Sequence, residues 1–209
     1  MTPAVAAHDE DEPPGVTMAG LPDRPSVALD PLLDAAAACF VRHGIARTRV
    51  PDIAAEMGVS RVTVYRQAGG IEQILGLLIA RDLQRLLDMI PSIDGKEDGP
   101  ALVVRILSGL VSEARSHPVL QKVLRDEPAV IGPLLATELP EIIDRAGAVL
   151  SPVLDLLASE GQIAHRDGRV LSGWLVRIGI SLILAPVEDA ESFLAEILRP
   201  ALEKSPGSA

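Results

Sequence analysis

The chain has 209 residues, of which 48% are hydrophobic and only 2% aromatic, and it carries a formal net charge of −10 at neutral pH. This length and composition allow one or two domains with cores of aliphatic side chains. The negative charge argues against a protein that binds nucleic acids without sequence preference. A lone Cys39 rules out an internal disulfide, and we expect its thiol to be buried on a helix.

No stretch of the sequence predicts a membrane-spanning or secreted protein. The most apolar run, 178–187, is far shorter than the roughly 20 residues that a bilayer-spanning helix needs. The amino-terminal segment has neither a basic start nor an apolar stretch, so it does not resemble a secretory signal. We therefore expect a cytoplasmic protein that does not enter a membrane.

The amino-terminal region divides into a tail and a first helix. Residues 1–25 are rich in Pro, Ala and acidic residues and show no periodicity, which predicts a disordered tail. A helix is expected to begin with Asp30 as its N-cap and Pro31 at its first position, and to end at Gly44. Its predicted inward-facing stripe consists of Leu32, Leu33, Ala36, Phe40 and Val41.

The segment 53–66 predicts two short helices joined by a tight turn, the first of them opened by residues 48–51. Gly58 stands where this helix must end and where a positive φ is favoured. Val59 is expected to plug the turn, and Ser60 to cap the next helix. The apolar stripe of the first of these helices consists of Ile53, Ala54 and Met57. This pattern is typical of a helix-turn-helix, which places its second helix in the major groove of DNA.

After Gly69 and Gly70 we predict only helices, because no stretch alternates with the period of a strand. A long connecting helix is expected over 71–90, followed by a turn-rich linker. The remaining helices are predicted at 101–116, 118–125, 128–136, 139–159, 167–185 and 189–202. Pro152 should kink or split the long helix that contains it, and Pro200 should interrupt the last one.

These motifs resemble the TetR family of bacterial transcriptional regulators. The resemblance rests on residues 32–75, with the helix end Phe40-Val41-Arg42-His43-Gly44, the segment 48–60 and the following Arg61-Val62-Thr63-Val64-Tyr65-Arg66. It implies an all-α homodimer whose last two long helices pair across a two-fold axis as a four-helix bundle. Most members of the family are repressors that leave DNA when a small molecule binds.

The resemblance also implies a division of the chain after the tail. A three-helix DNA-binding domain with a helix-turn-helix is expected at 26–70, and the connecting helix at 71–90. A C-terminal helical domain for ligand binding and dimerisation is expected at 101–204. This C-terminal half diverges widely within the family, so it identifies no ligand.

The predicted DNA contacts centre on the helix that follows Ser60. At about 100° per residue, Arg61 and Val62 share one face with Tyr65 and Arg66. Arg61 suits a bidentate contact with guanine, and Val62 suits a thymine methyl group. The resemblance assigns phosphate contacts to three of the side chains, namely Thr63, Tyr65 and Gln67. The predicted DNA-binding residues are Thr48, Arg49, Ser60, Arg61, Val62, Thr63, Tyr65, Arg66 and Gln67.

Two further observations bear on DNA binding. Thr48 and Arg49 lie just before a predicted helix, whose N-terminal N–H groups could bind a phosphate. The segment 42–66 contains five arginines against two acidic residues, so the net negative charge lies in the rest of the chain. An excess of acidic residues elsewhere discourages non-specific attachment to DNA.

Three positions depart from the family pattern and keep a second interpretation open. An aromatic residue is common in the family where Ala68 stands, a lysine where Ile71 stands, and a basic residue where Pro51 stands. Fewer cations weaken attachment to phosphates. The alternative is a ligand- or partner-binding helical dimer of the same fold that has lost sequence-specific DNA binding.

Nothing in the sequence predicts an enzyme, a metal site or a cofactor. His43, His117 and His165 lack the spacing of metal ligands, and no phosphate loop or nucleophile elbow occurs. Asp126 and Glu127 are adjacent, which favours a solvated helix end over a catalytic pair. The expected partners are double-stranded operator DNA, an unidentified small-molecule effector and a second copy of the chain.

The helix expected at 167–185 leaves two questions open. Trp174 could line a ligand pocket or anchor an interface. The small residues of the same helix fit either a dimer seam or close packing within one subunit; they are Ser172, Gly173, Gly179 and Ser181. Because aromatic residues are so scarce, a pocket among these helices favours aliphatic ligands over planar ones.

Overall fold

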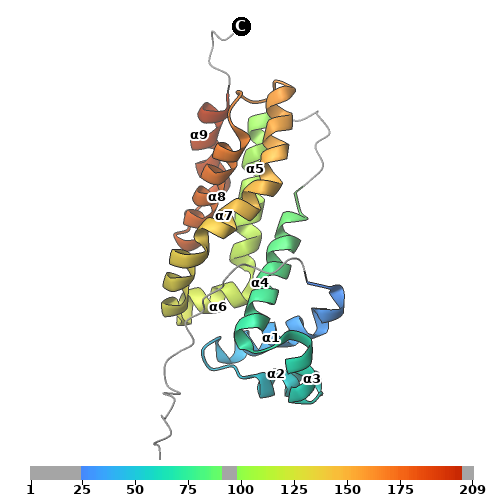
Figure 1. The fold of residues 1–209 in the computed structure, drawn as a ribbon. Helices are drawn as coiled ribbons and strands as arrows, with labels where there is room; N and C mark the ends of the chain where they lie inside the picture. Colours follow the sequence, from blue (N-terminus) through green and yellow to red (C-terminus); the bar gives the residue numbers. More distant parts are fainter. Residues whose placement is uncertain (1–24, 91–97, 204–209) are drawn as a thin grey trace, which may run out of the picture.

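The computed structural model describes residues 25–90 and 98–203, so the expected tail and most of the expected linker lie outside the described residues. Every regular element in these ranges is a helix (Figure 1). The N-terminal helices are η1 (Val27–Leu29), α1 (Asp30–His43), α2 (Val50–Met57), α3 (Arg61–Ala68) and α4 (Ile71–Leu87). The C-terminal helices are α5 (Gly99–Ser116), α6 (Pro118–Asp126), α7 (Pro128–Ser159), α8 (Gly168–Leu184) and α9 (Ala190–Leu202).

The start of α1 differs from the expectation. Ser26 caps the 3-10 helix η1, because its Oγ accepts a hydrogen bond from the N–H of Ala28 at 3.3 Å. Asp30 is therefore the first residue of α1 rather than its N-cap. Val41 was wrongly assigned to the inward stripe: it is 40% exposed, while Cys39 is buried as predicted. The buried face of the helix runs through Cys39 and Phe40. Val41 is turned about 100° from Phe40 around the helix axis and so lies outside this face.

Helices α1, α2 and α3 gather with α4 and α6 around one hydrophobic core, at the lower end of Figure 1. Its most deeply buried side chains include Leu33, Phe40, Ile53, Val64 and Ile74. Gly58 ends α2 with a φ of +68°, and the N–H of Val59 donates to the carbonyl of Ala54 at 2.9 Å. The side chain of Val59 is exposed, so the turn is closed by backbone hydrogen bonds and not by a valine plug.

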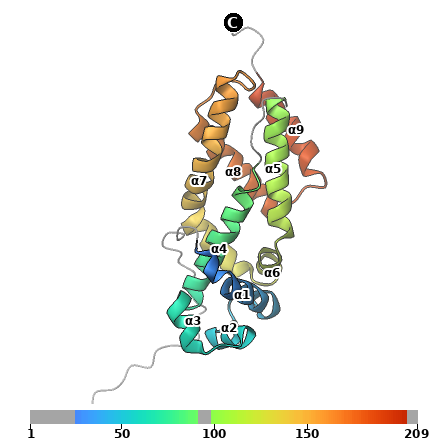
Figure 2. The ribbon, with the colours of Figure 1, turned by 90° about the vertical axis from the view of Figure 1, so that its right-hand side faces the viewer.

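Helices α5, α7, α8 and α9 form a second bundle, and Figure 2 shows α4 extending from the lower unit toward it. One side of α8 packs on α5, where a side chain at Gly179 would contact Leu107 and Val111. Ser172 and Gly173 are buried on the sides of α8 that face its neighbours. These small residues therefore serve packing within the subunit, whereas Ser181 is exposed. No helix in the described ranges is both long and apolar enough to span a membrane.

The segment 128–159 is one helix of 32 residues, not the two helices that we predicted. It contains Pro133, Pro140 and Pro152, all on its exposed side. Each proline removes one backbone donor, and a long helix absorbs such a loss by bending toward its packed side. Helix α7 bends along its length in Figure 1. Pro200 likewise lies inside α9 without ending it.

A network of charged side chains joins α1, α4 and α6. Arg81 of α4 is buried, and its Nη1 lies 2.7 Å from Oδ1 of Asp34 in α1. Its Nε donates to Oδ1 of Asp82 at 2.9 Å, and Oδ2 of Asp82 lies 3.0 Å from Nε2 of His117. His117 caps α6, since its Nδ1 accepts from the N–H of Leu120 at 3.4 Å. Burial raises the pKa of Asp82, but the hydrogen bonds from His117 and Arg81 outweigh burial and hold this pKa below its ordinary value.

Replacing Asp82 by Asn tests how much this network stabilises the fold. We expect the free energy of unfolding at neutral pH to fall by about 1–3 kcal/mol, because Arg81 and His117 each lose a charged acceptor. Since folding lowers the pKa of Asp82, its contribution is present above pH 3.8 and is lost as the pH falls below that value. Urea unfolding measures the difference. Asp144→Asn, at an exposed position on α7, is the control, and an equal loss in both variants would contradict the assigned role.

Candidate nucleic-acid interface

The turn between α2 and α3 sets the direction of α3. After Gly58 takes its left-handed conformation, Ser60 returns to extended backbone with φ −76° and ψ 149°. Its Oγ accepts a hydrogen bond from the N–H of Thr63 at 3.2 Å, which confirms Ser60 as the N-cap of α3. The hydroxyls of Ser60 and Thr63 also lie 3.0 Å apart. Ser60 is thus committed to the helix end, while the exposed side of α3 begins with Arg61.

Helix α3 is divided into a buried and an exposed side. Val64 is fully buried in the N-terminal core and Ala68 closes the same side, as the helical period requires. Val62 is 67% exposed and Tyr65 is 54% exposed, so both side chains are open to contact with a partner. The other exposed side chains of this helix are Arg61, Arg66 and Gln67.

The arginines near α3 differ in whether their guanidinium groups are engaged. Arg42 of α1 donates to Oε2 of Glu56 in α2 at 2.9 Å, and Arg47 donates to the carbonyl of His43 at 2.9 Å. Arg61 and Arg66 form no ion pair with any described residue, so both can accept a new anionic or carbonyl partner. The free cations of this unit therefore lie on the helix that also exposes Val62 and Tyr65.

The N-terminus of α2 is less open to a phosphate than we expected. Thr48 is fully buried, and its hydroxyl donates to the carbonyl of Gly44 at 2.6 Å, so this side chain is removed from the set of predicted contacts. The N–H of Arg49 donates to the carboxylate of Asp52 at 2.8 Å, and Pro51 has no N–H. A carboxylate already occupies the helix end where a phosphate would bind. The side chain of Arg49 is exposed, and its Nη1 donates to the carbonyl of Ala46 at 2.9 Å.

The three departures from the family pattern have simple structural roles. Ala68 is buried beside the N-terminal core, and Ile71 packs partly against the same core. Pro51 lies in the first turn of α2, where a missing N–H costs no helical hydrogen bond. None of these three positions alters the exposed side of α3.

Sequence reasoning missed one residue that holds this unit in place. Glu127, at the junction of α6 and α7, accepts hydrogen bonds from the N–H groups of Ile45 at 2.7 Å and Ala46 at 3.1 Å. It is therefore not part of a solvated helix end. The contact spans more than eighty residues and uses backbone donors, so no side-chain motif could have indicated it. In the described part of the chain, no group of three or more His, Cys, Asp or Glu side chains is placed to hold a metal ion.

The comparisons with known proteins agree with this geometry. Residues 32–78, which run from α1 into α4, match the model of the bacterial regulatory proteins of the tetR family. An uncharacterized HTH-type transcriptional regulator of Mycobacterium tuberculosis is 29% identical over 153 residues, which cover 73% of this chain and 75% of the relative. The residues that match the family model include both helices of the helix-turn-helix, α2 and α3.

Two solved structures share the fold over most of this chain. The TetR family repressor AlkX from a Dietzia strain, implicated in biodegradation of n-alkanes, has a TM-score of 0.58 and 24% identity, covering 86% of this chain and 95% of that one. The SmeT–triclosan complex has a TM-score of 0.59 and 20% identity, covering 87% of this chain and 94% of that one. At these identities the likeness concerns the fold.

The exposed α3, the family model and the sequence relatives lead to one conclusion. The tetR family consists of transcriptional regulators, not of enzymes. Residues 32–78 of this chain form the DNA-binding region of the tetR family of bacterial regulatory proteins, and the chain is a DNA-binding transcriptional regulator.

Proposed function

We propose that the protein is a homodimeric repressor that places α3 of each subunit in the major groove of an operator and leaves it when a small molecule binds. The observation that carries the proposal is the Ser60-capped α3, which exposes Arg61 and Arg66 without a described ion-pair partner. The first turn of such a helix reaches base edges. Because operators lie on the bacterial chromosome, the proposed function places the protein in the cytoplasm.

Some residues of α3 are proposed to contact bases and others to contact phosphates. Arg61 and Val62 in the first turn, with Arg66 one turn later, would contact base edges. The proposed phosphate contacts are made by Thr63, Tyr65 and Gln67, with Arg49 from the start of α2. Ser60 acts indirectly, because its cap orients the first turn of the helix. Thr48 acts indirectly as well, through the backbone of the α1–α2 turn.

The dimer would form through the outer faces of α8 and α9. Exposed residues of α8 recur in steps of four and three residues, at Val170, Trp174, Arg177, Ser181 and Leu184. Val170 is 71% exposed and Trp174 is 38% exposed, although both are large apolar side chains. Helix α9 adds the exposed Phe193 and Ile197. Two such stripes from each subunit fit a four-helix bundle, and an exposed apolar face of this kind is typical of an interface.

In the proposed function, each region of the chain has a separate role. Residues 26–70 would form the DNA-binding domain, 71–90 the connecting helix, and 101–204 the domain for dimerisation and ligand binding. AlkX is described as a repressor and SmeT as a complex with triclosan, so relatives of this fold supply precedents for both properties. Release requires that the small molecule favour a conformation in which the two copies of α3 no longer fit successive grooves.

Arg61→Ala tests the proposed base contacts. We expect the variant to lose about 1–3 kcal/mol of operator affinity and to relax the preference at one base pair in each half-site. The measurement is a titration with the DNA beside the protein's own gene, followed by selection from randomised half-sites. Arg105→Ala on α5 changes an exposed arginine outside the proposed DNA and dimer surfaces and should change neither property. Unchanged base selectivity in Arg61→Ala would mean that Arg61 does not contact bases. If the unaltered protein does not retard the DNA even at low salt, the alternative is favoured, namely a helical dimer of this fold that has lost DNA binding.

Trp174→Asp tests the proposed dimer. Burying a charge in place of an indole should weaken association by roughly 3 kcal/mol or more, about a hundredfold in the dissociation constant. Operator affinity should fall with it, since two half-sites need a fixed pair of subunits. Sedimentation velocity over a concentration series measures the monomer–dimer equilibrium. Trp174→Phe should stay dimeric, and a dimer of unaltered affinity in Trp174→Asp would show that the interface lies elsewhere.

A further inference from the structure

A cavity of about 420 Å³ lies where the two bundles meet. Helix α4 forms one wall with Leu78 and Ile79, and α6 forms the other with Leu120 and Val123. The remaining wall includes Ile45, which belongs to the turn between α1 and α2. An occupant of this cavity would thus touch the N-terminal unit directly, without an intervening helix.

Most of the residues that line the cavity are aliphatic. The charged groups of its lining are mostly paired already: Arg81 with Asp82, Asp82 with His117, and Arg85 with Asp30. The remaining one, Glu113, is exposed. None of the described lining residues is a phenylalanine, tyrosine or tryptophan. A charged occupant would lose its hydration without gaining a free partner deep in the cavity, which costs free energy. An aliphatic chain has no such desolvation cost. If a non-hydrogen atom fills roughly the 30 Å³ of a water molecule, the cavity of about 420 Å³ holds about fourteen of them.

The same turn that reaches the cavity is held by the carboxylate of Glu127. The Glu127 clamp consists of its two oxygens and the N–H groups of Ile45 at 2.7 Å and Ala46 at 3.1 Å. The neighbouring Gly44 has a φ of +85°, and a Cβ there would lie only 2.7 Å from Oε1 of Glu127. The clamp therefore depends on a close approach that leaves little room for displacement.

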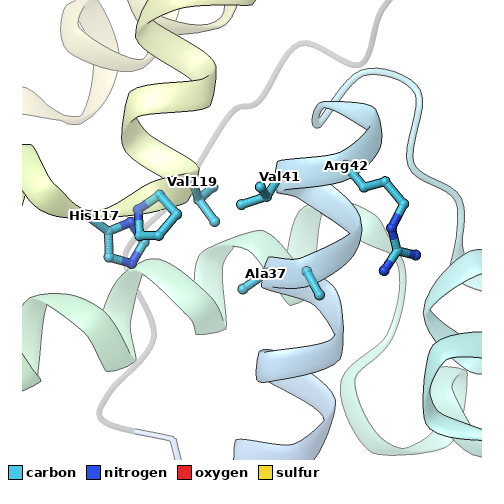
Figure 3. Close-up of a pocket in the computed structure, with 7 residues that line it drawn as sticks. Ala37, Val41, Arg42, His117 and Val119 are labelled. Atoms are coloured by element: carbon cyan, nitrogen blue, oxygen red, sulfur yellow. The ribbon is translucent and has the colours of Figure 1, made fainter.

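Helix α6 connects the cavity with α1. His117 and Val119 line the cavity, and they also line a groove between α1 and the start of α6, which Figure 3 shows. In that groove Val41 and Ala37 of α1 face α6, whereas Arg42 points away toward α2. A shift of α6 would consequently change its contacts with α1 and move Glu127 at its C-terminal end.

We propose that this cavity binds an uncharged small molecule with an aliphatic body, and that binding displaces Ile45 and opens the Glu127 clamp. The proposal rests on the proposed function, because it names the effector class and the route by which occupancy reaches α3. Loss of the clamp lets the α1–α2 turn move. The N-terminal core that holds α3 can then change its orientation.

Linear primary alcohols provide the first test. We expect 1-decanol to raise the Tm of the full-length protein and to weaken operator binding, with affinity rising up to about fourfold per added CH₂ from hexanol onward. The rise should stop near dodecanol, where the cavity is full. Decanoate, which carries a charge, should bind more weakly than 1-decanol. No stabilisation by any of the alcohols, or affinity that keeps rising past the cavity's capacity, would overturn the assignment.

A pair of matched variants locates the binding. Ile79→Trp combined with Leu120→Trp narrows the cavity and should reduce the affinity for 1-decanol at least tenfold while operator binding persists. The control combines Leu110→Trp with Ile183→Trp, at partly buried positions of the other bundle, and should bind 1-decanol as before. Equal affinity in both double variants would place the alcohol elsewhere.

Glu127→Gln tests the clamp itself. The amide offers one acceptor oxygen, and its NH₂ would face the other N–H group. We expect 1-decanol still to raise the Tm, but the ratio of operator affinities without and with the alcohol to fall by roughly threefold or more. Glu188→Gln, at an exposed carboxylate between α8 and α9, should keep the ratio of the unaltered protein. An unchanged ratio in Glu127→Gln would overturn the role of the clamp.

The outcomes separate this inference from the proposed function. If the ligand-free protein fails to retard its operator, the proposed function fails. If it retards the operator and 1-decanol neither raises the Tm nor weakens binding, only the present inference fails.

Discussion

Burial of Val64 is the constraint on which the DNA-binding surface depends. Helix α3 has eight residues, and an isolated helix of this length is unstable in water. Its position is therefore set from outside, by the fully buried Val64 on one side and the Ser60 cap at its start. With these two contacts made, the helical period leaves Arg61 and Tyr65 no place but the solvent-facing side.

The charge of the molecule is organised around this surface. The chain as a whole is acidic, with a net charge of −10, and most arginines near α3 are engaged by neighbouring carboxylates or carbonyls. Arg61 and Arg66 differ from Arg42 and Arg47 in this respect. An acidic remainder repels the DNA backbone, so stable binding requires the local contacts of α3. This arrangement favours selective binding over general attachment to nucleic acid.

The junction between the two bundles is polar on one side and aliphatic on the other. Arg81 joins α1 to α4 through Asp34, and the Asp82–His117 contact extends this connection to α6. Glu127 holds the α1–α2 turn from the far end of α6. Between these polar contacts lies the cavity that Ile45 helps to close. A change in α6 therefore reaches the N-terminal unit through two sets of contacts, which makes this short helix the natural point of coupling.

The sequence by itself determined the local features of the protein. The helix-turn-helix, the cap at Ser60, the turn at Gly58 and the buried Val64 all follow from residue types at fixed spacing, because capping and helical period act over a few residues. The absence of any strand pattern likewise predicted an all-helical fold, and every regular element in the described ranges is a helix.

Only the tertiary structure decided how each side chain is used. Thr48 and Val41 have the residue types of an exposed contact and a core position, yet packing reversed both assignments. The unbroken α7 depends on neighbouring helices that support it through its prolines, and propensity alone does not contain this support. Glu127 meets its partners across more than eighty residues, through backbone N–H groups that every residue except proline carries. Contacts of this kind leave no signature in sequence, because they depend on where the chain has folded and not on which residues are adjacent.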